Sequence, residues 1–214
     1  MIITVGSTKG GVGKSTTAIN LAVEAAKDKK RVLLVDTDPQ KTAISFRNER
    51  ATNDIKVIAL VTSTIHEDIS AYLPAFDIII IDAGGRDNSV FRSALAACEL
   101  FLLPVLPSQA DIWGMDDTVK AFKEIQPFNK MTGVILLNQV QQNTKVSSGA
   151  MEALEEYKSF LPLLPQQLHL RVAYKESLST GQGVSEFDPR GGAAEEMGEL
   201  YRALVEVYKG ISKR

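Results

Sequence analysis

One stretch near the amino terminus constrains the fold of this chain more than any other. Between Lys9 and Thr17 the sequence reads KGGVGKSTT. This stretch follows an apolar segment at 2–5 and precedes a helix-like pattern of small and apolar residues from Ala18 to Ala25. A strand, a glycine-rich loop and a helix, in that order, are the setting in which such a loop binds phosphate. The sequence therefore predicts an anion-binding loop at the amino terminus of a helix.

Each part of this loop has a physical role in binding a nucleotide. The glycines let the backbone curl so that successive N–H groups point inward and form a nest for an anion. The Lys14 amine can reach the β- and γ-phosphates, and the Ser15 hydroxyl can ligate Mg²⁺. The alternative is a glycine-rich turn that binds no ligand. We expect nucleotide contacts from Gly10, Gly11, Val12, Gly13, Lys14, Ser15 and Thr16.

Length and composition favour one globular domain spanning residues 1–214. Hydrophobic residues make up 44% of the chain, charged residues 23%, and the formal net charge is −2. A chain of this size can bury a sizeable core. Because the net charge is small, any contact with DNA or a membrane must come from a local patch. The single cysteine, Cys98, excludes an internal disulfide, and we expect a cytoplasmic protein without a signal peptide.

Strand-like and helix-like segments alternate along the chain. Apolar runs predict buried strands at 2–5, 31–36, 55–61, 76–82, 100–105 and 133–137, with a short further strand at 160–164. Helices are expected near 14–28, 41–52, 65–73, 88–98, 112–125, 147–158 and 192–211. Pro162 and Pro165 predict a loop before Leu168. Apolar strands separated by helices indicate a doubly wound α/β fold, with a mostly parallel sheet covered by helices on both faces. Its ligand is expected at the carboxyl ends of the strands.

Three acids follow predicted strands at their carboxyl ends. Asp36 and Asp38 lie in the motif DTDPQ after the strand at 31–36, and Asp82 follows four isoleucines. A carboxylate at the position of Asp82 can hold Mg²⁺ directly or through a water molecule. The alternatives are that Asp82 caps the next helix and that Asp36 and Asp38 are turn acids.

The loop with two lysines resembles the deviant Walker loop of the ParA/MinD family of ATPases. Thr8 stands where the plain phosphate-loop pattern has glycine, Lys9 follows it, and the sequence AINLA after Thr17 is also typical of that family. The resemblance is closest to small plasmid-type ParA partition ATPases. It implies ATP and Mg²⁺ as cofactors and a homodimer in which Lys9 reaches the phosphates of the partner. The alternative for Lys9 is a solvated loop lysine.

The same resemblance assigns roles to residues at the strand ends. It implies that Asp38 orients the attacking water, that Asp36 supports the water shell of the metal, and that Asn138 hydrogen-bonds adenine. The implied catalytic residues are Lys9, Lys14 and Asp38, and the implied metal site consists of Ser15, Asp36 and Asp82. The loop at 165–167 is expected to cover the base.

Two other segments match or depart from the family pattern. The sequence AGGRD after Asp82 departs from the proline-rich turn of many relatives, although small plasmid ParA proteins have glycine-rich versions. Arg86 in this segment is either a surface residue or a contact across the dimer. The sequence PVLPS at 104–108 resembles a turn at the dimer face of the family. Asp111 follows it and is alternatively a cap for the next helix.

The resemblance implies a protein that dimerises on ATP, binds DNA non-specifically, and is released when a ParB-like or cargo adaptor protein stimulates slow hydrolysis. Such a protein would be associated with the nucleoid and act in plasmid or chromosome partition. Non-specific DNA binding needs clustered cations. Candidates are Arg171, Lys175, Arg202, Lys209 and Lys213, each of which is alternatively part of a solvated surface.

Two further functions use the same ATPase chemistry. A MinD-like ATPase that cycles on the membrane needs a basic amphipathic tail. Leu200, Leu204, Tyr208 and Ile211 do share a helix face, but such a stripe is more often docked on a core, and we expect no membrane partner. Positioning of a protein cargo on the nucleoid differs from partition only in its partner. Isolated His66 and His169 make no metal cluster, and one cysteine excludes the nitrogenase-iron-protein branch.

Overall fold

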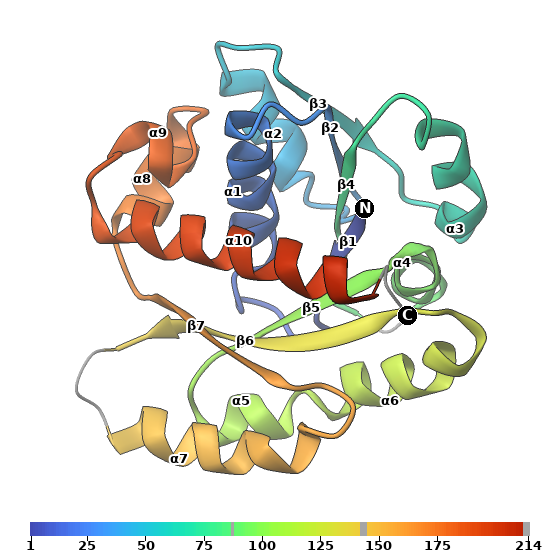
Figure 1. Ribbon diagram of the computed structural model, residues 1–214, viewed down its shortest axis with the longest axis vertical. Coiled ribbons are helices and arrows are strands. Elements are labelled where there is room, and N and C mark those ends of the chain that lie inside the picture. Colours follow the sequence, from blue (N-terminus) through green and yellow to red (C-terminus); the bar gives the residue numbers. More distant parts are fainter. Residues whose placement is uncertain (87, 142–144, 212–214) are drawn as a thin grey trace.

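The computed structural model describes residues 1–86, 88–141 and 145–211. Its centre is a sheet with strand order β3-β2-β4-β1-β5-β6-β7, in which the described pairs run parallel (Figure 1). From β1 the chain moves outward to β2 and β3, returns to β4, and continues through β5 on the other side. The predicted doubly wound α/β fold is confirmed. The strands are β1 (Ile2–Val5), β2 (Val32–Asp36), β3 (Ile55–Ala59), β4 (Ile78–Asp82), β5 (Leu100–Val105), β6 (Thr132–Val140) and β7 (Leu163–His169).

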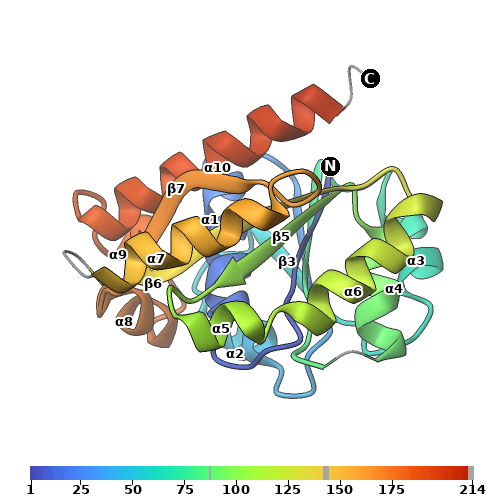
Figure 2. The same cartoon turned by 90° about the horizontal axis from the view of Figure 1, so that it is seen from below.

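Helices cover both faces of the sheet and form two separate cores with it (Figures 1 and 2). The first face carries α1 (Lys14–Lys27), α2 (Thr42–Glu49), α8 (Ala173–Ser179), α9 (Val184–Phe187) and α10 (Gly192–Ile211). The second carries α3 (Ile65–Asp68), α4 (Ser89–Ala97), α5 (Gln109–Trp113), α6 (Asp116–Ile125) and α7 (Lys145–Leu154). Short 3-10 turns follow three of these helices, at Ile69–Tyr72, Gln126–Phe128 and Glu155–Tyr157. Because both faces are covered, β1, β2, β4 and β5 are buried along their whole length.

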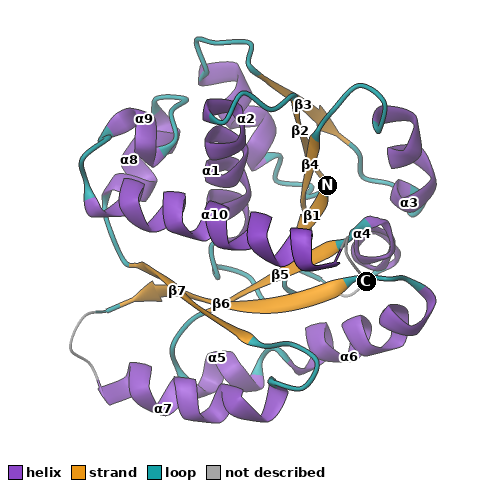
Figure 3. Ribbon diagram, in the orientation of Figure 1, coloured by secondary structure: helices purple, strands orange, loops and turns teal. Residues whose placement is uncertain are grey.

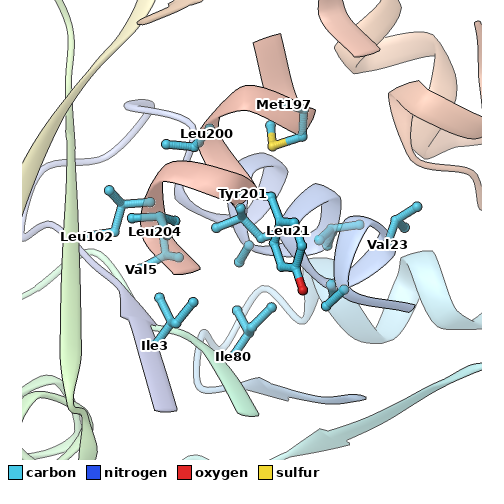
Figure 4. Packing of buried hydrophobic residues seen from close by; sticks show 14 of the residues in the cluster. Ile3, Val5, Leu21, Val23, Ile80, Leu102, Met197, Leu200, Tyr201 and Leu204 are labelled. Carbon is cyan, nitrogen blue, oxygen red and sulfur yellow. The ribbon is translucent and has the colours of Figure 1, made fainter. Parts of the chain in front are cut away.

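The long helix α10 packs across α1 and the sheet (Figure 4). Leu200 and Leu204 are 0% exposed, and they pack in one cluster with residues of β1 and α1. The Tyr201 hydroxyl donates a hydrogen bond to Asp28 at the end of α1, and Ile211 packs against the same cluster. The apolar stripe of this helix is therefore docked on the core, as the sequence predicted.

The segment from 163 to 169 is a strand, so the prediction of a loop before Leu168 was wrong. Strand β7 lies at the edge of the sheet and pairs only with β6 (Figure 3). Proline is tolerated at such an edge because an edge strand leaves alternate N–H groups unpaired. Register shifts between β6 and β7 accommodate the irregularity. No helix among the described residues is long and apolar enough to cross a membrane.

Helices α8 and α9 were not predicted, and α5 begins earlier than expected. Helix α8 has seven residues and α9 has four, which is too short for an apolar repeat to be recognised. Helix α5 begins at Gln109 because the Ser108 hydroxyl accepts a hydrogen bond from the Asp111 N–H and caps it.

Leu204→Ala should destabilise the protein strongly, because the side chain is completely buried between α10 and the sheet. We expect a loss of about 2–5 kcal/mol in the free energy of unfolding, measured by denaturant titration. Glu199→Ala, on an exposed position of the same helix, is the control and should change stability little. If Leu204→Ala were as stable as the control, α10 would not be docked as described.

Candidate active site

The glycine-rich loop between β1 and α1 has a backbone shape that requires glycine. Gly11 and Gly13 have φ values of 78° and 87°, in the left-handed region. A Cβ atom on Gly13 would also lie 2.3 Å from the Asn138 side-chain nitrogen. Gly13 directly precedes α1, so the loop opens onto the amino terminus of a 14-residue helix. This is the arrangement in which backbone N–H groups and a helix terminus attract an anion.

The end of β6 holds this loop in place. Asn138 donates a hydrogen bond to the Val12 carbonyl at 2.7 Å, and Gln139 donates one to the Gly11 carbonyl at 3.0 Å. Gln139 has a φ of 54°, which is unusual for a residue other than glycine. Residues with such backbone conformations are often found at functional sites. Gln139 could not be singled out from the sequence, because its contact depends on a backbone conformation that its residue type does not reveal.

Lys14 lies at the centre of the loop with its amine largely removed from solvent. Its side chain donates to the Lys9 carbonyl at 2.9 Å and the residue is 8% exposed. Burial lowers the pKa of Lys14, and the negative charges of Asp82 and Asp38 oppose that effect. A Cβ atom on Gly85 would lie 3.3 Å from the same amine, so the loop after β4 passes directly beside it.

Asp36 is buried and its carboxylate is occupied by backbone groups. One oxygen accepts hydrogen bonds from the Ala43 and Ile44 N–H groups at the start of α2, and the other accepts from the Asp38 N–H. Burial raises the pKa of Asp36, and these three N–H groups oppose the rise. Asp36 therefore fixes the start of α2 and the turn that carries Asp38.

Asp82 is the buried acid whose carboxylate has no such partners. It is 0% exposed, lies opposite Asp36 in the β2–β4 register, and neither oxygen finds a hydrogen-bond partner among the described residues. Burial raises the pKa of Asp82 to about 7, and the charge of Asp36 adds to the rise. The Ser15 hydroxyl, which lies nearby without forming a hydrogen bond of normal geometry, and the Lys14 charge lower the pKa in part. A buried carboxylate with two free oxygens fits Mg²⁺ or its bound water. Ser15 and Asp82 are the residues that would hold the ion.

Asp38 and the loop after β4 face each other across an open cavity of about 440 Å³. One Asp38 oxygen accepts from the Gln40 N–H at 2.8 Å, and the other lies 3.7 Å from the position of a Cβ atom on Gly84. Arg86 is exposed and also lines this cavity. The arrangement leaves room for a substrate group or a water molecule beside Asp38.

Lys9 extends from the loop onto α5. Its amine forms an ion pair with the Asp111 carboxylate and donates to the Ala110 carbonyl at 3.2 Å. The alternative that Asp111 caps the next helix was wrong, because Ser108 caps α5 and Asp111 lies in its first turn. Trp113 follows on α5 with 67% of its surface exposed. Lys9 is thus held within its own chain.

A second, smaller cavity of about 80 Å³ lies between the phosphate-binding loop, the end of β6 and the segment after β7. Its wall includes Asn138, Gln139 and residues from 168 to 171, with Tyr174 and Lys175 behind them. The residues of the predicted cover at 165–167 do not line this cavity, although Leu168 and His169 of the same strand do.

Four of the five candidate DNA-binding residues lie within the described part of the chain, two at the smaller cavity and two on α10. Arg171 and Lys175 line the smaller cavity, and Arg171 is paired with Glu196 of α10 at 2.7 Å. Arg202 and Lys209 are exposed on α10, where Lys209 pairs with Glu206 at 2.6 Å. Lys213 lies outside the described residues.

Known proteins match this chain over most of its length. Residues 3–184 match the CobQ/CobB/MinD/ParA nucleotide binding domain. The maintenance of carboxysome distribution protein A of Halothiobacillus neapolitanus is 24% identical over 209 residues, covering 95% of each chain. The chromosome-partitioning ATPase Soj of Thermus thermophilus is 27% identical, covering 95% of this chain and 93% of its own. The septum site-determining protein MinD of Pyrococcus horikoshii, solved with Mg-ADP, has the same fold, with a TM-score of 0.77, 18% identity and coverage of 100% and 99%.

Asp82→Asn should stabilise the nucleotide-free protein at neutral pH. In the folded protein the pKa of Asp82 is about 7, whereas its ordinary value is 3.8. Between these values the unfolded chain has released the proton and the folded protein has kept it, so the free energy of unfolding falls as pH rises. An asparagine side chain does not ionise, so the Asp82→Asn variant should not lose free energy of unfolding in this way as the pH rises. Thermal unfolding at pH 7.5 should show a higher Tm for the variant, and even ~1 kcal/mol shifts Tm by about 2–4 °C at this chain length.

The Tm difference should shrink as the pH falls and disappear only well below the ordinary pKa of 3.8, where Asp82 is protonated in the folded and the unfolded protein. Glu199→Gln, an exposed carboxylate on α10, is the matched control and should show no comparable pH-dependent gain. A lower or unchanged Tm for Asp82→Asn at pH 7.5 would contradict the description of Asp82 as a buried, unpartnered acid.

Proposed function

The chain belongs to the CobQ/CobB/MinD/ParA nucleotide-binding family, and we propose that it is a ParA-type ATPase that dimerises on ATP and binds DNA without sequence preference. A partner protein releases it by stimulating hydrolysis. The observation that carries this proposal is the pair of lysines on one loop. Lys14 points into the cradle formed by its own chain, whereas Lys9 points out of it onto α5. A second lysine outside the cradle is suited to the phosphates of a neighbouring subunit.

The residues around Lys14 suit the binding of Mg-ATP. The Lys14 amine would contact the β- and γ-phosphates, and the N–H groups between Gly10 and Ser15 would surround them. Ser15 and Asp82 would hold Mg²⁺, which neutralises the charge that develops on the transferred phosphoryl group. The absence of hydrogen-bond partners on Asp82 supports this assignment. Asp36 would act indirectly, by fixing the turn before Asp38.

Asp38 is suited to orienting the attacking water. One of its oxygens is fixed by the Gln40 N–H, and the cavity beside Asp38 is open to solvent. The Lys14 charge lies close enough to Asp38 for each to influence the other. A water held by Asp38 could attack the γ-phosphorus while Lys14 stabilises the negative charge on the phosphoryl oxygens.

Dimerisation requires Lys9 to change partners. In the single chain its amine is paired with Asp111 and with the Ala110 carbonyl. To reach the phosphates bound to a second subunit, the Lys9 amine would exchange the Asp111 carboxylate for a phosphate chain that carries more negative charge. The gain in charge increases with the negative charge of the phosphate chain opposite, so the γ-phosphate of ATP would favour the dimer more than ADP does.

The protein would act in the cytoplasm, associated with the nucleoid. Its cargo would be a plasmid, a chromosome or a protein assembly. One relative is named for carboxysome distribution and another for chromosome partitioning, which supports both kinds of cargo. A ParB-like or cargo adaptor protein would stimulate hydrolysis. The DNA contacts remain candidates at Arg171, Lys175, Arg202, Lys209 and Lys213. Cycling on a membrane is less well supported, because the apolar stripe of α10 packs on the core.

Lys14→Ala and Asp38→Ala should separate binding from turnover. Lys14→Ala removes the phosphate-binding amine and should abolish ATP binding in a fluorescent-nucleotide titration. Asp38→Ala should retain ATP binding, accumulate the ATP dimer in size-exclusion chromatography, and lower kcat about 100-fold or more. Normal hydrolysis by Asp38→Ala would show that Asp38 does not orient the water.

Binding to random-sequence duplex DNA should require ATP. We expect binding with ATP, little with ADP or without nucleotide, and a steep decrease in affinity as salt increases, because phosphate contacts release counterions. Lys14→Ala is the matched control and should not bind under any condition. The DNA part of the proposal fails if the wild-type protein binds ATP but no DNA, and vesicles of anionic lipid are then the next ligand to test.

A further inference from the structure

Thr37 separates the two acids of the DTDPQ motif and has a buried hydroxyl at the centre of the site. Main-chain pairing between β2 and β4 ends with Asp36 opposite Asp82. Thr37 is the next residue and is 1% exposed. Neither the end of a strand nor a turn before proline requires a hydroxyl at position 37. The reason for a threonine here must therefore lie in the contacts of its hydroxyl.

The Thr37 hydroxyl makes two hydrogen bonds to the segment that follows β4. It donates to the Asp82 carbonyl at 2.9 Å, and it accepts from the Gly84 N–H at 3.3 Å. The Thr37 N–H donates to the same Asp82 carbonyl at 3.1 Å. A hydroxyl has one proton to donate and lone pairs to accept with, so both capacities are used. The side chain thereby continues the pairing of the two segments one residue beyond the main-chain ladder.

This bridge connects the turn that carries Asp38 with the loop that passes Lys14. Beyond Thr37, the backbone of Asp38 lies 3.7 Å from the position of a Cβ atom on Gly84. Beyond Gly84, a Cβ atom on Gly85 would lie 3.3 Å from the Lys14 amine. The Thr37 hydroxyl is therefore the side-chain link in a continuous path from the Asp38 carboxylate to the phosphate-binding amine.

We propose that Thr37 is a positioning residue for ATP hydrolysis, whose hydroxyl holds the loop at 84–86 at a fixed spacing from Asp38. That spacing determines where a water on Asp38 stands relative to a γ-phosphate on Lys14. The proposal rests on the proposed role of Asp38 as the water-orienting residue. Thr37 itself touches neither reactant, and its effect passes through Asp38 and Gly84.

Two substitutions separate the hydroxyl from the shape of the side chain. Thr37→Val keeps the branched shape but removes both hydrogen bonds and leaves the Gly84 N–H without its partner. Thr37→Ser keeps the hydroxyl and loses only a methyl group. We expect Thr37→Val to lower kcat about 10- to 100-fold, since a displacement of about 1 Å near the reacting atoms has that effect. Thr37→Ser should stay within about threefold of the wild type.

Binding of ATP distinguishes positioning from a general structural role. For Thr37→Val the Kd for ATP, measured with a fluorescent analogue, should stay within about threefold of the wild-type value. If this variant does not fold, Thr37→Ala takes its place in the same comparison. A normal kcat overturns the proposal, as do a parallel loss of ATP binding and an equal loss of kcat in Thr37→Ser.

The double variant with Asp38→Ala tests whether Thr37 acts through Asp38. If it does, Thr37→Val should cause no further loss in the Asp38→Ala background, because the two effects are not additive. Losses that multiply overturn the proposal. An Asp38→Ala protein that hydrolyses ATP normally overturns the proposed role of Asp38 and this proposal with it. An inactive Asp38→Ala beside a fully active Thr37→Val overturns the Thr37 proposal alone.

Discussion

The electrostatic attraction between a buried ammonium group and a buried carboxylate is the constraint on which this site depends. Lys14 and Asp82 are both largely removed from water, and burial alone would neutralise each of them. Each lowers the cost of charging the other. The attraction is incomplete, because the Asp82 oxygens lack hydrogen-bond partners among the described residues. In the proposed function, a phosphate chain would complement the charge of Lys14 and its divalent cation would complement that of Asp82.

The fold places these groups by simple means. The parallel register of β2 and β4 sets Asp36 opposite Asp82. Strand β1 lies between β4 and β5, so the glycine loop that follows β1 brings Lys14 to the same carboxyl ends of the strands. The two acids then differ in function because their surroundings differ. Asp36 is saturated by three backbone N–H groups and organises a turn. Within the described part of the chain the Asp82 oxygens accept no hydrogen bond, which suits the cation-binding role proposed for this residue.

The sequence predicted the sheet, most helices and the loop because these depend on local patterns. Buried strands need continuous apolar runs, and a left-handed backbone in the loop needs glycine at Gly11 and Gly13. The features that could not be predicted from the sequence depend on contacts between segments far apart in the chain. Gln139 contacts a carbonyl 128 positions away, and Thr37 contacts a backbone group 47 positions away. Lys9 was recognised as exceptional, but its pairing with Asp111 becomes visible only when α5 is placed beside the loop. Strand β7 was predicted only in part, as a short strand at 160–164, because two prolines outweighed the tolerance of an edge position.

The position of the single tryptophan has a practical consequence. Trp113 is the only tryptophan in the chain, lies two residues after the partner of Lys9, and has most of its indole in solvent. Indole emission is sensitive to the polarity of its surroundings, so the intrinsic fluorescence of this protein reports on one defined region of its surface. That region is the surface of α5, the helix whose Asp111 pairs with Lys9. The wild-type chain thus carries its own optical label for any event that removes water from this face.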